Sequence, residues 1–432
     1  MQADQYFDRA VLLYGAGIEA KSTRDFLSEF APNVKVYVTA DQGDIFLPDS
    51  TIIAPSEIEA LCEKGEIGTI IRSAGVSIYK PEIQAAKEHG VEITTNINLW
   101  DKFKRNGAKL VAVTGTKGKS TTVKLTETML ACAGIDARLG GNFGIAPLDL
   151  DDHDIIVMEL SSYQVADLTA QPDFVGFTNL FPEHVHWHNH SLQQYFHDKL
   201  NLLRREGPYA YALGAQAAVN QKVQDALPKY AHELAAPSAE LVAALHATMR
   251  KSRLKGPHNA DNMIIAAKLA LGLGASEEGI LKGLETFAPP AHRLEEHKIG
   301  DYLFVDDSIA TTPEATMAAI ASYPDEKIAL LVGGYDRDQN YEELARTVAN
   351  SNVTTLCCLP TTGERMQAAM DEVDHQIDVF AAEGLADAME GLKRRDGFGT
   401  IILSPAAPSF NQYENYIARG DHFIQLANEI FA

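Results

Sequence analysis

A glycine-rich run between an apolar segment and a helical segment carries the clearest chemistry in this sequence. Residues 113–122 read VTGTKGKSTT, and the apolar residues 110–113 predict a strand that leads into them. Glycines let a backbone fold around phosphate, and the N-terminus of the next helix favours an anion. The strict phosphate-loop spacing would need glycine at Val113, so this is a shortened variant. We predict that nucleotide phosphate is bound by Gly115, Thr116, Lys117, Gly118, Lys119, Ser120 and Thr121.

A second candidate is a carboxylate at the end of a strand. Residues 155–162 form an apolar run that ends in Glu159, followed by two serines. The carboxyl ends of parallel strands border the ligand crevice of such a sheet, and a carboxylate there can hold the magnesium that accompanies ATP. We therefore expect Glu159 and the hydroxyl of Ser120 to be magnesium ligands.

Histidines occupy alternate positions from residue 184 to residue 190. Imidazoles are common zinc ligands, so a zinc site is conceivable. No cysteine lies nearby, and a helical continuation would point the rings to different faces. We favour one functional histidine with three bystanders. Lys199 lies in a predicted helix, and by composition alone it belongs to a solvated face.

Charge and cysteine content exclude several classes of protein. The chain has 432 residues and a formal net charge of −22, without a long basic run, so nucleic acid is not an expected partner. None of the four cysteines has CxxC spacing, which fits a reducing cytoplasm. No secretion signal and no membrane-spanning apolar run is expected, and neither is a membrane partner.

Short apolar runs alternate with helical stretches along the whole chain, which predicts an α/β protein of three domains. We expect an N-terminal domain over 1–100, a central domain over 101–290 and a C-terminal domain over 291–432, with a charged linker at 101–109. Each domain is predicted to hold a parallel sheet. In the first domain the turn Gly15-Ala16-Gly17 follows the first strand, a weak phosphate signal because it holds only two glycines of the dinucleotide fingerprint.

The order of these motifs resembles the Mur ligases of bacterial peptidoglycan synthesis, in particular the glutamate-adding branch of that family. The resemblance covers essentially the whole chain. It rests on residues 114–122, 140–142, 159–164, 192–199, 256–262, 292–293, 307–311, 333–334 and 404–420.

This resemblance implies a Rossmann-like UDP-binding N-terminal domain, a central phosphate-loop ATPase domain with a parallel sheet, and a Rossmann-like C-terminal domain that brings the amino acid. It implies ATP and two Mg²⁺ ions as cofactors, with a carbamylated Lys199, and Lys119, His184 and Lys199 as catalytic residues. The implied metal ligands are Ser120, Glu159, His184 and Lys199. The implied additional ATP contacts are Asn259, Asn262, Arg293 and Asp307. The implied substrate contacts are Gly17, Ile18, Ser73, Gly75, Asn142, Ser162, Thr311, Arg337, Ser409 and Tyr416.

The activity implied is addition of glutamate to UDP-N-acetylmuramoyl-L-alanine through an acyl phosphate, by a cytoplasmic monomer that supports cell wall synthesis, cell shape and division. D-glutamate is favoured over L-glutamate. The chain departs from the pattern at Ile309 and Arg337, where lysines are usual, and at His186, where Asp is usual. These positions belong to the amino-acid pocket or adjoin it, so an L-glutamate branch stays open.

Two alternatives remain at this point. A folylpolyglutamate synthase also couples ATP to glutamate addition, but it begins directly with its phosphate-loop domain, whereas some 100 residues precede the loop here. A non-catalytic ATP-binding switch module would have no use for Glu159, His184 and Lys199 in one cleft.

Overall fold

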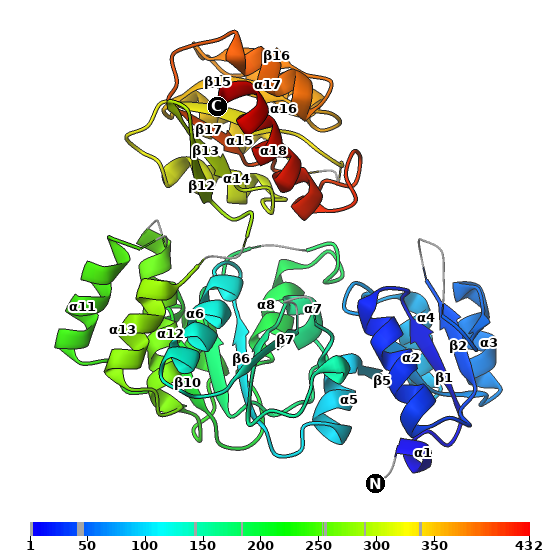
Figure 1. Ribbon diagram of the computed structural model, residues 1–432. Helices are drawn as coiled ribbons and strands as arrows, with labels where there is room; N and C mark the ends of the chain where they lie inside the picture. The colour runs from blue at the N-terminus through cyan, green and yellow to red at the C-terminus, as the bar shows by residue number, and fades with distance from the viewer. Residues whose placement is uncertain are drawn as a thin grey trace. The chain divides into compact units, whose positions relative to one another are not determined.

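The computed structural model describes residues 3–40, 47–141, 145–182, 185–252, 254, 257–288, 291–336 and 339–432. Its contacts divide the chain into two compact units, residues 1–287 and 288–432. Three sheets account for the strands of the described residues: two in the first unit and one in the second. The α/β fold class with mostly parallel sheets is therefore confirmed (Figure 1).

The N-terminal sheet has the order β3-β2-β1-β4-β5, and all its strand pairs are parallel. Its strands are β1 (Ala10–Tyr14), β2 (Val36–Thr39), β3 (Thr51–Ile52), β4 (Ile67–Arg72) and β5 (Glu92–Thr95). Its helices are α1 (Ala3–Tyr6), α2 (Ile18–Phe30), α3 (Ile58–Glu63), α4 (Pro81–Glu88) and α5 (Asn96–Phe103). The central strands β1 and β4 are almost wholly buried, as expected of strands covered by helices on both faces.

The central sheet has the order β11-β10-β9-β6-β8-β7 and is also parallel throughout. Its strands are β6 (Lys109–Thr114), β7 (Arg138–Gly141), β8 (Ile155–Glu159), β9 (Phe174–Phe177), β10 (Ala210–Leu213) and β11 (His232–Glu233). Its helices are α6 (Lys119–Cys132), α7 (Ser162–Val165), α8 (Leu192–Leu200), α9 (Ala215–Ala218), α10 (Gln221–Ala226), α11 (Ala239–Met249), α12 (Pro257–Gly272) and α13 (Glu277–Thr286). Strand order reverses at β6, the position where ligands bind in such sheets.

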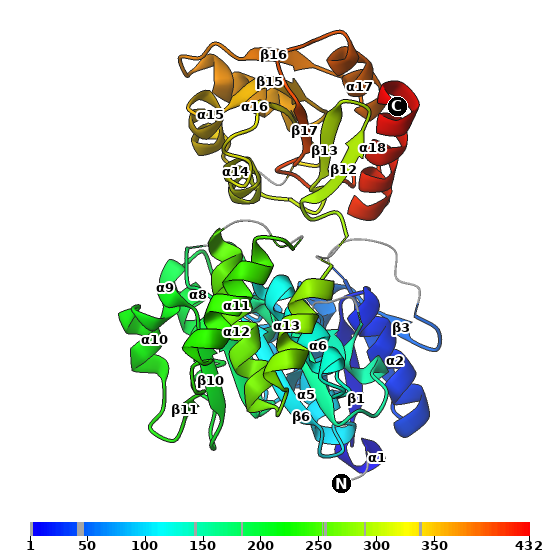
Figure 2. The same ribbon diagram turned by 60° about the vertical axis from the view of Figure 1, so that its left-hand side comes forward.

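Helix α6, which follows the glycine-rich run, packs against α12 and α13 (Figures 1 and 2). Two glycines of α13 allow the close crossing. A Cβ at Gly279 would lie 2.6 Å from the Cα of Ala133, and one at Gly283 would lie 2.6 Å from the Cα of Met129. The C-terminal part of α6 therefore packs closely against α13.

The second unit contains one sheet of order β12-β13-β17-β14-β15-β16. Its strands are β12 (Glu295–Ile299), β13 (Tyr302–Asp306), β14 (Ile328–Val332), β15 (Val353–Cys358), β16 (Asp378–Ala381) and β17 (Thr400–Leu403). Its helices are α14 (Pro313–Ala321), α15 (Glu342–Ala349), α16 (Gly363–Asp371), α17 (Leu385–Lys393) and α18 (Tyr416–Phe431). The edge strand β12 runs antiparallel to β13, a hairpin that the sequence patterns did not predict.

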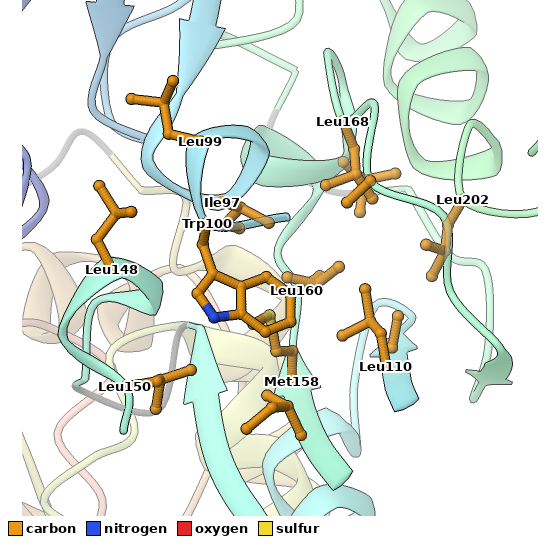
Figure 3. Close-up of a cluster of buried hydrophobic side chains, with 14 of the residues drawn as sticks. Ile97, Leu99, Trp100, Leu110, Leu148, Leu150, Met158, Leu160, Leu168 and Leu202 are labelled. Carbon is orange, nitrogen blue, oxygen red and sulfur yellow. The ribbon is translucent and has the colours of Figure 1, made fainter. Parts of the chain in front are cut away.

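One apolar core joins the first two sheets. Figure 3 shows the indole of Trp100, on α5, among Leu148, Leu150 and Met158. Trp100 is 2% exposed, and the same cluster continues to Val11 and Leu13 of the N-terminal sheet. The expected linker at 101–109 is therefore wrong in part, because α5 extends to Phe103 and packs into this core.

A buried arginine adds a polar tie between the two sheets. Arg72, the last residue of β4, has a side chain with 0% exposure and forms a two-pronged ion pair with Asp167, just after α7. Its Nη2 also donates to the carbonyl of Tyr163 at 2.7 Å. The guanidinium lies 5.2 Å from the ring of Trp187, within cation–π range.

We predict that Arg72→Met destabilises the first unit by about 3 kcal/mol, because it leaves the largely buried Asp167 carboxylate without its cation. Thermal and urea unfolding of the full chain measure the change. The matched control is Arg346→Met, which breaks an exposed helical pair with Glu342 and should change stability by less than about 0.5 kcal/mol. If both substitutions changed the free energy of unfolding equally, the ion pair of Arg72 with Asp167 would not stabilise the first unit.

Candidate active site

The glycine-rich loop between β6 and α6 is shaped by two positions that have no room for a side chain. Gly115 has φ 142° and Gly118 has φ 86°, both in the region that favours glycine. A Cβ at Gly115 would lie 1.9 Å from Oγ1 of Thr178, and one at Gly118 would lie 2.2 Å from Oδ1 of Asn262. Glycine is thus required at both positions, which explains the spacing of the motif.

The loop is fixed to the segment that follows β9. The amide of Thr116 donates to the carbonyl of Asn179 at 2.9 Å, and the amide of Lys117 donates to Oδ1 of the same residue at 2.9 Å. Oγ1 of Thr178 donates to the carbonyl of Lys117 at 2.6 Å. On the other side, Asn262 meets Gly118 and donates to Oδ1 of Asn259 at 2.9 Å. The two asparagines predicted to bind ATP therefore lie at the loop.

Two lysines from distant parts of the sequence converge on one carbonyl group. Nζ of Lys119 donates to the carbonyl oxygens of Gly115 at 3.1 Å and Thr116 at 2.9 Å. Nζ of Lys199, from α8, donates to the same Gly115 oxygen at 2.8 Å. Lys199 is 2% exposed, which corrects its assignment by composition to a solvated face. Lysine is almost never so buried unless its charge is met.

The predicted magnesium ligands lie beside this loop. Glu159 ends β8, pairs in register with Val113 of β6 and is 4% exposed, while Ser120 occupies the first turn of α6. A buried carboxylate at the carboxyl end of a strand and a hydroxyl at the start of a helix fit Mg²⁺, which prefers oxygen ligands. Within the described ranges no three His, Cys, Asp or Glu side chains are grouped as a metal site would need.

One histidine expected to be a bystander is instead part of a buried polar chain. His188 is 0% exposed, with Nδ1 2.6 Å from Oδ2 of Asp198 and Nε2 3.0 Å from Oγ of Ser162. His186 and His190 are exposed, with ring centroids 5.1 Å apart. His188 is thus buried, while the expectation of one functional histidine with three bystanders stays a prediction. Alternation along the sequence gave no signal of which ring is buried.

Three predicted site residues lie outside the described residues: Asn142, His184 and Arg337. The predicted sugar-nucleotide contacts are described. The turn at Gly15 packs on Ser73, since a Cβ at Gly15 would lie 2.4 Å from the Ser73 hydroxyl. Oε2 of Glu19 accepts from the amide of Ala74 at 2.6 Å. These contacts bring the segment that holds Gly17 and Ile18 beside the segment that holds Ser73 and Gly75, and Ile18 is 64% exposed.

In the second unit, Asp307 follows β13 in a closed environment. It is 5% exposed and accepts from the hydroxyl of Ser404 at 2.7 Å and the amide of Leu294 at 3.3 Å. Burial raises the pKa of Asp307 to about 7, although Ser404 and the nearby Arg293 act in the opposite direction. His292 and Leu294, on either side of Arg293, have φ of 59° and 48°, a strained turn of the kind found at functional sites.

The predicted amino-acid contacts also lie in this unit. Ser409 is 2% exposed, the carbonyl of Tyr416 accepts from the Ser308 hydroxyl at 2.8 Å, and the carbonyl of Thr311 accepts from Gln339 at 3.0 Å. Sequence patterns missed Arg419, which is 2% exposed and donates through Nη2 to the carbonyl of Ser308 at 2.8 Å. Burial lowers the pKa of Arg419 to about 10.

A cleft lies at the end of the central sheet that is opposite the glycine-rich loop. It is lined by Lys104, His153 and Asp154 among others, and it contains no residue with a predicted role.

Among the helices of the described ranges, none is both long enough and apolar enough to cross a bilayer.

Known proteins with similar sequences share nearly the full length of this chain. The profile of the Mur ligase middle domain matches residues 113–245. A relative from Micromonospora sp. is 31% identical over 98% of this chain and 97% of its own length. One from Xanthomonas oryzae pv. oryzae is 31% identical over 99% and 97%. Both are named UDP-N-acetylmuramoyl-L-alanine–L-glutamate ligase.

Solved structures agree on the fold at low sequence identity. The MurF of Acinetobacter baumannii superposes with a TM-score of 0.58 at 15% identity, over 98% of this chain and 93% of that one. The UDP-N-acetylmuramate-alanine ligase MurC of Thermotoga maritima gives 0.57 at 16% identity, over 96% and 98%.

The fold shared with the solved ligases, the glycine-rich loop and the matching middle-domain profile define the class of this protein as the ATP-dependent ligases. With the full-length relatives, the family is settled: the chain belongs to the Mur ligases.

The pKa of Asp307 leads to a prediction about pH. A carboxyl group whose folded pKa of about 7 exceeds its unfolded value keeps a proton that the unfolded chain releases, so it stabilises the fold at low pH. This stabilisation disappears as pH rises through 7. We expect Asp307 to contribute about 1 kcal/mol more stability at pH 6 than at pH 8. Asp307→Asn should remove that difference in thermal unfolding, and an unchanged pH profile would contradict it.

Proposed function

We propose that this ligase adds glutamate to UDP-N-acetylmuramoyl-L-alanine with hydrolysis of ATP to ADP and phosphate, as a step of peptidoglycan precursor synthesis. The observation that carries the proposal is the convergence of Lys119 and Lys199 on the carbonyl of Gly115, beside Glu159. Full-length likeness to relatives that bear this activity in their names supports the choice of substrates.

The chemistry follows from the groups at the loop. A carboxylate oxygen of the alanine attacks the γ-phosphorus of ATP, the bond to the bridging oxygen breaks, and ADP leaves. The amine of glutamate then attacks the acyl carbon, inorganic phosphate leaves, and the amine loses a proton. Lys119 and the backbone amides at the start of α6 stabilise charge on the transferring phosphoryl group. Asn259, Asn262, Arg293 and Asp307 are proposed to hold the rest of the nucleotide.

We propose two Mg²⁺ ions, held by Ser120, Glu159, His184 and a carbamylated Lys199. Bound magnesium supplies charge neutralisation to the phosphates. Carbamylation joins the neutral lysine amine to the carbon of CO₂ with loss of a proton, and it converts the side chain to an anion. Without the modification, the ammonium groups of Lys119 and Lys199 both contact the carbonyl oxygen of Gly115. A carbamate at Lys199 would instead place a negative charge near the ammonium group of Lys119.

The amino acid is proposed to be L-glutamate. The sequence pattern favoured D-glutamate, but both relatives described above carry L-glutamate in their names, and the departures at His186, Ile309 and Arg337 affect the amino-acid pocket. Contacts to glutamate are assigned to Thr311, Arg337, Ser409 and Tyr416. Contacts to the nucleotide sugar are assigned to Gly17, Ile18, Ser73, Gly75, Asn142 and Ser162. We further propose that the protein is cytoplasmic and that it is a monomer. Size-exclusion chromatography of the purified protein tests the monomeric state.

The activity is tested by phosphate release with UDP-N-acetylmuramoyl-L-alanine and ATP. We expect release to require the nucleotide sugar and to be much faster with L-glutamate than with D-glutamate or without amino acid. Phosphate release that is indifferent to the nucleotide sugar would overturn the proposed function. A preference for D-glutamate would overturn only the stereochemistry.

Lys199→Ala should lower kcat by at least about 100-fold, because it removes a side chain proposed to hold the magnesium that neutralises the phosphates. If Lys199 acts as a carbamate, a short carboxylic acid in the assay should restore part of the rate by occupying the space of the missing anion. The matched control is Lys282→Ala, an exposed lysine on α13, with unchanged kcat. Full activity of the Lys199 variant, or no response to added acid, would exclude the carbamate.

A further inference from the structure

The segment between β4 and α4 is bonded to a tryptophan of the central part of the chain. We call residues 73–79 of this segment the strap. The indole Nε1 of Trp187 donates to the carbonyl of Ala74 at 3.1 Å, and the Ser77 hydroxyl donates to the carbonyl of Trp187 at 2.6 Å. Trp187 is 8% exposed. Two polar groups of one buried residue are therefore bonded to the strap.

The indole of Trp187 also packs on α7. The ring of Tyr163 stacks on it, with centroids 4.7 Å apart and an interplanar angle of 14°. The ring of Tyr79, from the strap, meets it edge-on with centroids 6.1 Å apart. Tyr163 belongs to α7, which begins three residues after Glu159. Trp187 thus contacts both the strap and the helix that follows a predicted magnesium ligand.

The backbone just after Trp187 is strained. Asn189 and His190 have φ of 55° and 52°, in the left-handed region that residues other than glycine rarely adopt. Such turns persist only where the surrounding structure holds them. The bonds of Trp187 to the strap are contacts of this kind, and they make the conformation of the turn depend on the position of the strap.

The strap also contacts the helix that reaches the glycine-rich loop. The Tyr79 hydroxyl donates to Asp198 of α8 at 2.8 Å. From the same helix, Oη of Tyr195 lies 3.0 Å from Oγ1 of Thr116 in the loop. A series of direct contacts therefore joins the strap to the loop through α8.

The start of the strap carries proposed contacts of the nucleotide sugar, Ser73 and Gly75. These two residues flank Ala74. The carbonyl of Ala74 accepts from Trp187, and its amide donates to Glu19 at 2.6 Å. Gly75 is exposed, so a ligand can reach this part of the strap. A ligand that binds there meets a peptide whose position Trp187 fixes.

We propose that Trp187 is a positioning residue that couples binding of the nucleotide sugar at the strap to binding of ATP at the glycine-rich loop. This inference rests on the proposed function, which assigns these two ligands to these two places. Each ligand favours the arrangement in which the strap, Trp187 and α8 are in contact, so each strengthens the binding of the other. Coupling of this kind is reciprocal and typically changes affinity roughly 5- to 150-fold.

Calorimetry on the full-length protein measures the coupling without turnover. The Kd of UDP-N-acetylmuramoyl-L-alanine is determined with and without saturating Mg²⁺ and adenylyl imidodiphosphate, an ATP analogue that does not transfer its terminal phosphate. We expect the analogue to tighten binding of the nucleotide sugar about 10-fold, and the nucleotide sugar to tighten binding of the analogue by the same factor. Independent binding of the two ligands to the unsubstituted protein would overturn the inference and leave the proposed function intact.

Two variants and a matched control test the role of Trp187. Trp187→Phe keeps a ring against Tyr163 but has no N–H for Ala74, and Ser77→Ala removes the other bond to the strap. Each should reduce the coupling about 5-fold, the size of one hydrogen bond. The control is Trp100→Phe, because Trp100 is the only other tryptophan of the chain and packs in an apolar core that includes no strap residue. It should lower the melting temperature and keep the full coupling.

Thermal unfolding establishes that each variant is folded. Full coupling in folded Trp187→Phe would overturn the positioning role. Equal loss of coupling in Trp100→Phe would overturn it too, because the effect would then follow any loss of packing. If Trp187→Phe does not fold, the comparison of Ser77→Ala with the control decides alone. Failure of the unsubstituted protein to bind the nucleotide sugar would instead overturn the proposed function, and this inference with it.

Discussion

The site depends on one close approach, that of the backbone at Gly115 and Gly118 to the elements around it. Without side chains at these two positions the loop lies against Thr178 on one side and Asn262 on the other. That packing turns the Gly115 carbonyl toward Lys119 and Lys199, although the two lysines come from helices far apart in the sequence. The carboxylate of Glu159 reaches the same edge because β8 pairs with β6 in register.

A second constraint is the union of the first two sheets. Trp100 fills the core under the central sheet, and Arg72 reaches from the end of β4 to Asp167 beyond α7. The same region holds the hydrogen bond from Tyr79 to Asp198, the residue before Lys199. The segment after β4 is thus tied to the helix that carries the buried lysine by direct contacts.

The sequence predicted those parts of the fold that depend on a single local sequence pattern. Short β-branched runs identified the buried parallel strands, and the glycine-rich run identified the loop, because both follow from local chemistry. The antiparallel strand β12 was missed, since its alternating residues 295–299 include charged side chains that look like a surface turn. The burial of Lys199 and His188 could not be predicted from composition, because it depends on partners such as Gly115 and Ser162 that are distant along the chain. Resemblance to a family corrected the interpretation of Lys199. Nothing in the sequence indicated the burial of His188.

The shared core around Trp100 has a consequence for how this protein can be divided. A break near residue 100 would expose the indole, together with the leucines that surround it, to water, so the first hundred residues are not an exchangeable cassette. The second unit begins at residue 288, and its two apolar clusters are formed by residues of that unit. An exchange of pieces between relatives at residue 100 would therefore divide a packed apolar core.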